Sequence, residues 1–161
     1  MSAPGGTPEE RVAALGLELP PVVPPVASYL PTAQTGSLVY TAGQLPIVKG
    51  ELVATGKVGA DVSAERAGEL ARICALNVIA AIKAEVGELS RVTRIVKVVG
   101  FVASAPDFYG QPQVINGASD LLGAVFGEAG MHARSAVGVA ALPLNAPVEV
   151  EAIAEVSGQG G

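Results

Sequence analysis

The last third of the chain carries the side chains best suited to chemistry. Arg134 stands at the start of a stretch of small and apolar residues, and its guanidinium is a planar, always charged fork of donors that fits a carboxylate. Glu149 and Glu151 fall on one face of a strand expected near the C-terminus, because side chains alternate along a strand. Two acids on one side of an apolar strand are costly to bury unless they are paired or functional. From these residues alone, Arg134 can hold a planar carboxylate or form a surface or interface salt bridge, and the two glutamates can serve a site or pair with basic residues across a subunit contact.

A framework of strands and helices must position these residues. Ser63 is the expected N-cap of a helix whose apolar residues recur every three or four positions, and Gly87 is its expected C-cap. Asp107 is predicted to cap a second helix that ends near residues 127–130. Strands are expected over 26–35, 37–44, 91–103, 135–142 and 148–156, with a loop or hairpin over 48–59.

This order of elements predicts an α+β domain. The economical packing places the two helices on one face of a mostly antiparallel sheet. The other face, with small and branched residues such as Val96 and Val98, is expected to pack against sister subunits. We expect an N-terminal extension over 1–25, with a short helix capped by Thr7 and a proline-rich connector, a domain over 26–157, and a flexible tail over 158–161.

The composition limits the classes of partner. Half of the residues are hydrophobic and 16% are charged, so a chain of 161 residues is expected to hide part of its surface in subunit contacts. The formal net charge is −5 and aromatic residues make up 4%, which disfavours nucleic acid as a partner. No apolar stretch is long enough to span a bilayer and the N-terminus does not resemble a signal peptide, so a cytoplasmic protein is expected.

Single residues exclude two further kinds of site. Cys74 is the one cysteine, which rules out an intrachain disulfide, and its apolar helical context indicates a buried thiol. His132 is the one histidine, so a metal cluster of several histidines is excluded, and a loop position is expected for it.

Several short motifs, separated along the chain, occur together in this sequence. The first two are Tyr29 and the segment Thr41-Ala-Gly-Gln-Leu-Pro46, followed by Asp107-Phe108 and Asn116. The last two are Ala133-Arg-Ser…Val-Ala-Ala-Leu-Pro143 and Val148-Glu-Val-Glu-Ala-Ile-Ala154. Together they resemble the RidA/YjgF (reactive intermediate deaminase) family over residues 26–156, whereas each motif alone is weak.

The resemblance implies a chorismate-mutase-like fold with a mostly antiparallel six-stranded sheet, two helices on one face, and a homotrimer with sites in the clefts between subunits. In that family the arginine equivalent to Arg134 holds a substrate carboxylate. The glutamate equivalent to Glu149 positions or activates water. The family's thiol after the Arg-Ser pair is replaced by Ala136, so only main-chain donors remain there.

The implied reaction is hydrolysis of a reactive 2-imino acid, or of its enamine form such as 2-aminoacrylate, to a 2-keto acid and ammonia. No metal or cofactor is required for it. The resemblance further implies that Tyr29 and Asn116 line the pocket, with backbone donors near Gly43 and Ala136.

Two other functions stay open from the sequence. A trimer that binds small keto or amino acids without turnover uses the same Arg134. An endoribonuclease or translation inhibitor, as the family's older names suggest, is disfavoured by the acidic composition and the scarcity of aromatic residues.

Overall fold

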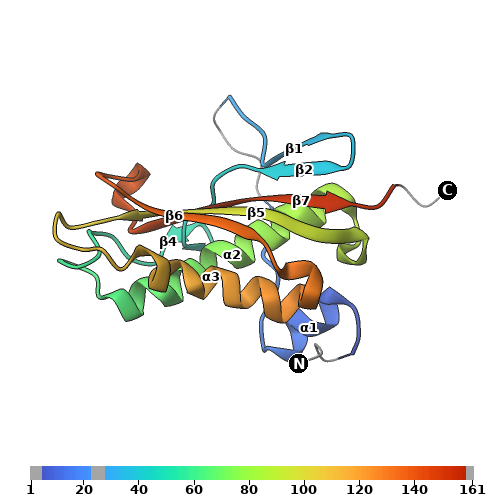
Figure 1. Ribbon diagram of the computed structural model, residues 1–161, viewed down its shortest axis with the longest axis horizontal. Helices are drawn as coiled ribbons and strands as arrows, with labels where there is room; N and C mark the ends of the chain where they lie inside the picture. Colours follow the sequence, from blue (N-terminus) through green and yellow to red (C-terminus); the bar gives the residue numbers. More distant parts are fainter. Residues whose placement is uncertain (1–4, 23–27, 159–161) are drawn as a thin grey trace.

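The computed structural model describes residues 5–22 and 28–158. Its elements in chain order (Figure 1) are α1 (Pro8–Ala14), β1 (Thr32–Thr35), β2 (Leu38–Thr41), β3 (Ile47–Val48), β4 (Glu51–Leu52), α2 (Ala64–Val86), η1 (Leu89–Arg91), β5 (Val92–Ala103), α3 (Gln111–Phe126), η2 (Gly127–Gly130), β6 (Ala133–Val139), η3 (Pro143–Asn145) and β7 (Val148–Val156). Three predicted features lie outside the described residues: positions 26 and 27 of the first strand, the domain boundary at 25 and 26, and positions 159–161 of the tail.

Helix α2 begins and ends where the sequence predicts. The Ser63 side chain accepts a hydrogen bond from the Arg66 backbone N–H at 3.1 Å, which satisfies one of the amide groups left unpaired in the first turn. At the other end Gly87 adopts a φ of 85°, and its N–H donates to the Lys83 carbonyl. The predicted apolar stripe, including Cys74, is buried against the sheet and α3, which confirms the buried thiol.

Helix α3 begins later than predicted. Its N-cap is Gly110, so the prediction that Asp107 caps it is wrong. The physical reason is Pro112, which lacks an N–H and is tolerated only in the first turn of a helix. A helix capped by Asp107 would place this proline in its interior. The end of α3 at Phe126, followed by Gly127, agrees with the prediction.

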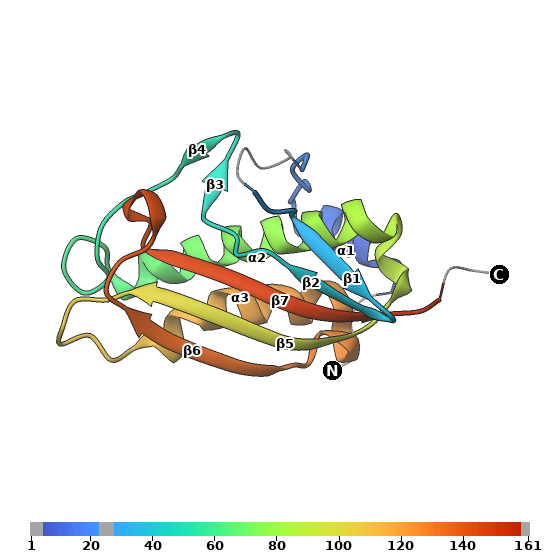
Figure 2. The same ribbon diagram turned by 90° about the horizontal axis from the view of Figure 1, so that it is seen from above.

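The main sheet has five strands in the order β1-β2-β7-β5-β6 (Figure 2), so the prediction of six strands is wrong. The segment predicted as a loop or hairpin forms a separate ribbon of β3 and β4. The pairs β1–β2, β2–β7 and β7–β5 are antiparallel, whereas β5 and β6 are parallel, which makes the sheet mixed. Helix α3 connects β5 to β6 and returns the chain to the starting edge, as a parallel pair requires.

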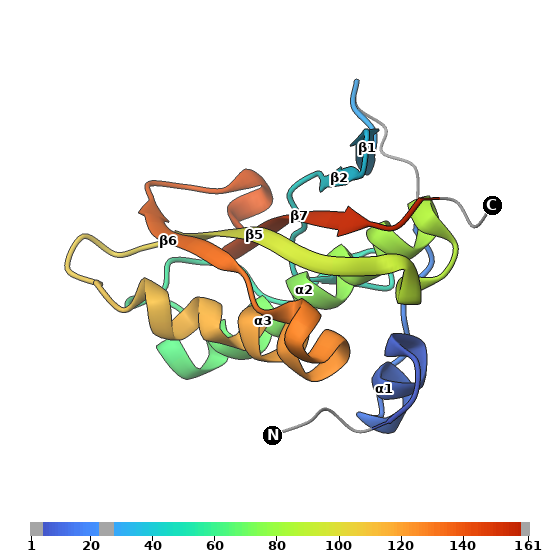
Figure 3. The same ribbon diagram turned by 45° about the vertical axis from the view of Figure 1, so that its right-hand side comes forward.

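Helices α2 and α3 cover the same face of the sheet, as predicted (Figure 3). No α-helix of the described residues covers the opposite face. The expected assignment of Val98 to that open face is wrong, because Val98 is fully buried on the helix side. Val96 is 37% exposed, and Tyr40 and Val137 are 42% and 43% exposed. The open face therefore presents apolar side chains to solvent in the isolated chain.

The short helix α1 is attached to the helical layer (Figure 3). Thr7 and Glu10 form a reciprocal capping box at its start, and Pro8 occupies the first turn. Its Glu9 carboxylate accepts hydrogen bonds from Lys83 Nζ at 2.8 Å and from the Leu89 N–H at 2.9 Å. These bonds join α1 to the end of α2 and to η1. The division into an extension over 1–25 and a domain over 26–157 stays a prediction.

We expect Gly117→Ala to lower the free energy of unfolding by about 1–3 kcal/mol, because a Cβ at Gly117 in α3 would overlap the carbonyl of Gly68 in α2. Backbone atoms cannot rotate away as a side chain does. Chemical denaturation of both chains measures the difference. The matched control is Gly123→Ala in the same helix, where a Cβ meets nothing within 4 Å and higher helix propensity is expected to stabilise. Equal effects of the two substitutions would contradict this account of the α2–α3 contact.

Candidate functional site

The guanidinium of Arg134 is held at the start of β6 by three hydrogen bonds to α3. Nη1 donates to Asn116 Oδ1 at 2.8 Å and to Ser119 Oγ at 3.2 Å, and Nη2 donates to the Pro112 carbonyl at 3.3 Å. A guanidinium has five N–H groups, so the Nε–H and one Nη2–H remain for a ligand. No acidic side chain of the described residues forms an ion pair with Arg134. Within the described residues, this arrangement leaves the positive charge and two donors unmatched.

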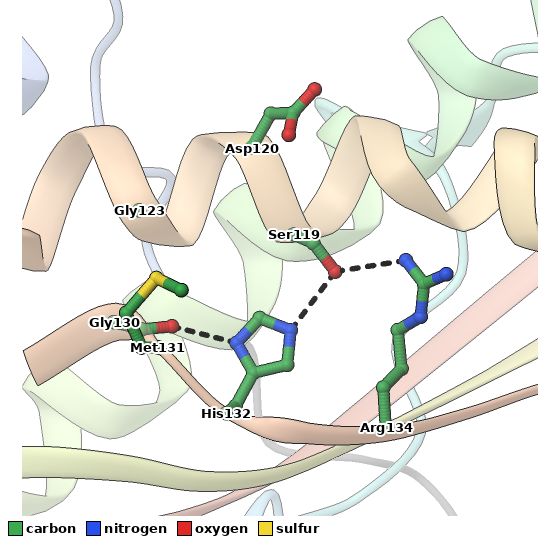
Figure 4. Close-up of a pocket in the computed structure, with 7 residues that line it drawn as sticks. All are labelled: Ser119, Asp120, Gly123, Gly130, Met131, His132 and Arg134. Carbon is green, nitrogen blue, oxygen red and sulfur yellow. Dashed lines mark hydrogen bonds between the residues drawn. The ribbon is translucent and has the colours of Figure 1, made fainter. Parts of the chain in front are cut away.

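A histidine supports this arrangement from the segment before β6 (Figure 4). His132 Nδ1 lies 2.6 Å from the Gly130 carbonyl, and its Nε2 lies 2.9 Å from Ser119 Oγ. Because a carbonyl only accepts, Nδ1 carries the proton, and in the neutral ring Nε2 then accepts the Ser119 hydroxyl proton. Ser119 thus donates to His132 and accepts from Arg134. The two polar side chains fix the position of the cation.

A pocket of ≈ 410 Å³ opens beside these residues. It lies between the C-terminal half of α3 and the segment from η2 to β6 (Figure 4). The lining residues are Ser119, Asp120, Gly123, Gly130, Met131, His132 and Arg134. The unmatched charge of Arg134 therefore lies at the wall of a space that can admit a small molecule.

Glu149 belongs to a second cluster, on β7. An added Cβ at Gly43 would lie 2.5 Å from Glu149 Oε1, so this glycine provides the room that the carboxylate occupies. Gly43 follows β2, and the neighbouring Gln44 and Val150 exchange backbone hydrogen bonds. Burial raises the pKa of the Glu149 carboxyl above its ordinary value of 4.5, and the negative charge of Glu151 raises it further. A carboxylate of this kind exchanges protons more readily near neutral pH than an exposed one does.

The two clusters lie on opposite faces of the sheet. Arg134 pairs with Val98, which is fully buried beneath the helices, so Arg134 points to the helix side. Glu149 alternates along β7 with the fully buried Val148 and Val150, so it points to the open side. Strand β5 separates the two strands, which places them about 10 Å apart across the sheet. Arg134 and Glu149 of one chain therefore do not face a common ligand.

The remaining predicted site residues divide in the same way. Asn116 is bonded to Arg134, and the half-buried Ala136 follows Arg134 by two residues on β6 and packs against the helical side of the core. Gly43 lies with Glu149. Tyr29 precedes β1, and its side chain is 57% exposed. The structure thus brings together one pair around Arg134 and another around Glu149.

The sequence reasoning missed Ser119 and the contacts of His132. A signal for both was present. His132 precedes Arg134 by two residues in extended backbone, which puts the two side chains on one side. Ser119 follows Asn116 by three residues on a helix, which puts those two on one face. The loop position expected for His132 is confirmed.

Comparison with known proteins agrees with the motifs and the fold. The family model described as "YjgF/chorismate_mutase-like, putative endoribonuclease" matches residues 9–156. The chain belongs to the RidA/YjgF family. Its match begins inside α1, so the family resemblance extends further towards the N-terminus than the motifs indicate.

Two relatives are similar to this RidA/YjgF family chain over most of its length. The chain is 44% identical to Protein TCP17 of Trypanosoma cruzi, over 91% of this chain and 95% of that protein. It is 35% identical to a 2-iminobutanoate/2-iminopropanoate deaminase of Salmonella typhimurium, over 80% of this chain and 88% of that one.

Solved structures of the family show the same fold. The Agrobacterium tumefaciens protein Atu1372, of unknown function, has 46% identity and a TM-score of 0.86, with 93% of this chain and 92% of that chain covered. Escherichia coli TdcF with bound serine has 28% identity and a TM-score of 0.62, with 83% and 92% covered. The α+β fold of the YjgF/chorismate-mutase-like family is thereby confirmed.

Two further findings concern the described residues alone. They include no group of three or more His, Cys, Asp or Glu side chains placed to hold a metal ion. None of their helices combines the length and the apolar character needed to cross a membrane.

Proposed function

We propose that this chain hydrolyses reactive 2-imino acids, or their enamine forms such as 2-aminoacrylate, to 2-keto acids and ammonia. The observation that carries the proposal is the Arg134 guanidinium, fixed by three hydrogen bonds and left with two donors beside a pocket. Two parallel N–H groups suit a bidentate contact with the carboxylate that all these substrates share. The Salmonella relative named as an imine deaminase supports the reaction, and TdcF with bound serine supports a small carboxylate-bearing ligand.

The reaction requires only a positioned substrate, a water molecule and a group that transfers protons. A water oxygen bonds to the electrophilic imine carbon, and one of its protons passes to the nitrogen. The resulting carbinolamine expels ammonia as the carbonyl forms. Glu149 can take the proton from water and return it to the departing nitrogen, a role that its raised pKa favours. Fixed geometry alone can recover about 7–11 kcal/mol of the barrier in favourable cases.

The site needs a second copy of the chain. Because Arg134 and Glu149 lie on opposite faces of one sheet, both reach one substrate only if different subunits supply them. The open face exposes the apolar side chains of Tyr40, Val96 and Val137, and burying them against another subunit would favour association. A homotrimer with the substrate in each cleft between subunits is the assembly we propose.

The test is turnover by the purified chain. An amino-acid oxidase generates 2-imino acids in place, and ammonia release is followed with and without the protein. We expect faster release with the protein than in buffer. Binding of 2-keto acids by calorimetry without any acceleration would instead favour a non-catalytic binding protein, which the serine bound in TdcF makes a specific second candidate. The absence of both turnover and binding would overturn both candidate functions.

A further inference from the structure

We infer that the pocket beside Arg134 receives the side chain of the substrate, and that this chain prefers 2-imino acids with an apolar side chain of about four carbons or more. The inference rests on the proposed function, since it takes Arg134 as the carboxylate anchor. The volume of ≈ 410 Å³ gives an open pocket with room for a side chain of this size. A three-carbon acid such as 2-aminoacrylate would leave most of this space empty.

Two polar side chains of the pocket, Ser119 and His132, are already hydrogen-bonded within the chain. His132 Nδ1 donates to the Gly130 carbonyl, and His132 Nε2 is bonded to Ser119. The Ser119 oxygen also accepts from Arg134. Apart from the two remaining donors of Arg134, these groups have no unmet bond to offer a substrate side chain. A polar group placed against them would lose its water without a new partner, which disfavours it.

The rest of the wall is apolar or turned away. The carboxylate of Asp120 points away from His132 and Arg134 (Figure 4). Met131 is 65% exposed at the rim, and its flexible thioether adapts to apolar shapes. An apolar side chain is therefore the occupant that this surface favours.

Two glycines shape the pocket in different ways. A Cβ at Gly130 would overlap the Leu122 carbonyl, so only glycine lets η2 lie this close to α3. Gly123 has the opposite surroundings, because a Cβ there would meet no atom within 4 Å. Glycine inside a helix lowers its stability relative to alanine. At Gly123 no contact requires it, and what it preserves is space in the pocket.

The experiment measures the affinity of stable 2-keto acids, the reaction products, by calorimetry on the full chain. The probes are pyruvate, 4-methyl-2-oxopentanoate, and 2-oxoglutarate, whose side chain ends in a carboxylate. For the unchanged chain we expect 4-methyl-2-oxopentanoate to bind about tenfold or more tightly than pyruvate. Gly123→Leu fills the pocket and is expected to abolish that preference. Gly68→Ala, a helix glycine whose Cβ meets only an ordinary contact at 3.8 Å, is expected to keep it.

The outcomes separate this inference from the proposed function. If Gly123→Leu leaves the preference for the longer acid unchanged, or if 2-oxoglutarate binds most tightly, the inference fails while Arg134 still anchors a carboxylate. If no 2-keto acid binds, or if Arg134→Ala binds them all as well as the unchanged chain does, the proposed function fails and the inference with it.

Discussion

Arg134→Ala is expected to lower kcat/KM for 2-imino acids by about 100-fold or more, and to weaken 2-keto acid binding to a similar degree. The reason is that Arg134 holds the one positive charge of the pocket, with no acidic partner among the described residues. When the guanidinium is removed, a carboxylate bound there loses a positively charged partner and two directed hydrogen-bond donors. Steady-state kinetics with calorimetry on 2-keto acids measure both effects.

Control variants distinguish a loss of carboxylate binding from a loss of folded structure. Arg134→Lys keeps the charge but not the planar fork, so an intermediate loss is expected. Arg66→Ala removes an exposed arginine whose salt bridge to Glu69 contributes little, and it is expected to change neither activity nor affinity. The thermal midpoint of Arg134→Ala reports whether Asn116 and Ser119 tolerate the loss of their donor. A folded Arg134→Ala protein with unchanged affinity would show that the carboxylate binds elsewhere.

Elements with local signals could be predicted from the sequence. Ser63 and Gly87 mark the ends of α2 through their own backbone preferences, and the alternation along 148–156 defines β7. Each signal depends only on neighbouring residues. The start of α3 differs from the predicted one because two local signals compete, and the missing N–H of Pro112 outweighs the capping preference of Asp107.

The division of the site could not be predicted in this way. Whether Arg134 and Glu149 share a face depends on how β6 and β7 pair with β5, and a shift of one residue in that register would reverse the face of either side chain. The motifs identified both residues as candidates, but their spacing along the chain carries no information about which face each one occupies. Strand pairing is non-local, so only the fold shows that one chain separates them.

Glu149→Gln is expected to lower kcat by about 10²–10⁴-fold, because an amide of the same shape neither takes a proton from water nor returns it to nitrogen. Affinity for 2-keto acids is expected to stay near that of the unchanged chain, since Arg134 is intact. Glu155→Gln, on the same face of β7 but exposed, is the matched control and is expected to retain activity. Unchanged kcat in Glu149→Gln would remove the carboxylate from the reaction.

Glu149→Gln is also expected to change the pH dependence of thermal unfolding, and the direction of the change follows from the raised pKa of Glu149. The pKa of Glu149 is raised in the folded state. Its contribution to the free energy of unfolding is therefore fully present below the unfolded-state pKa, and it is lost as pH rises through the folded-state pKa. The unchanged chain thus carries at neutral pH a cost of ionisation that Gln lacks. We expect Glu149→Gln to unfold at a higher temperature than the unchanged chain at neutral pH, with the gap closing as pH falls through the folded-state pKa and fully closed below the ordinary value of 4.5.

Chains carrying Arg134→Ala and chains carrying Glu149→Gln are expected to restore activity when they are co-expressed. If each site takes its arginine from one subunit and its glutamate from another, random assembly at equal amounts leaves both groups intact in about a quarter of the sites. A site contained within one chain gives no recovery at all, because every chain then lacks one of the two groups. The measured quantity is the specific activity of the co-purified assembly relative to the unchanged protein. Because the two side chains point to opposite faces of the same sheet, recovery near that fraction is the result that the geometry predicts.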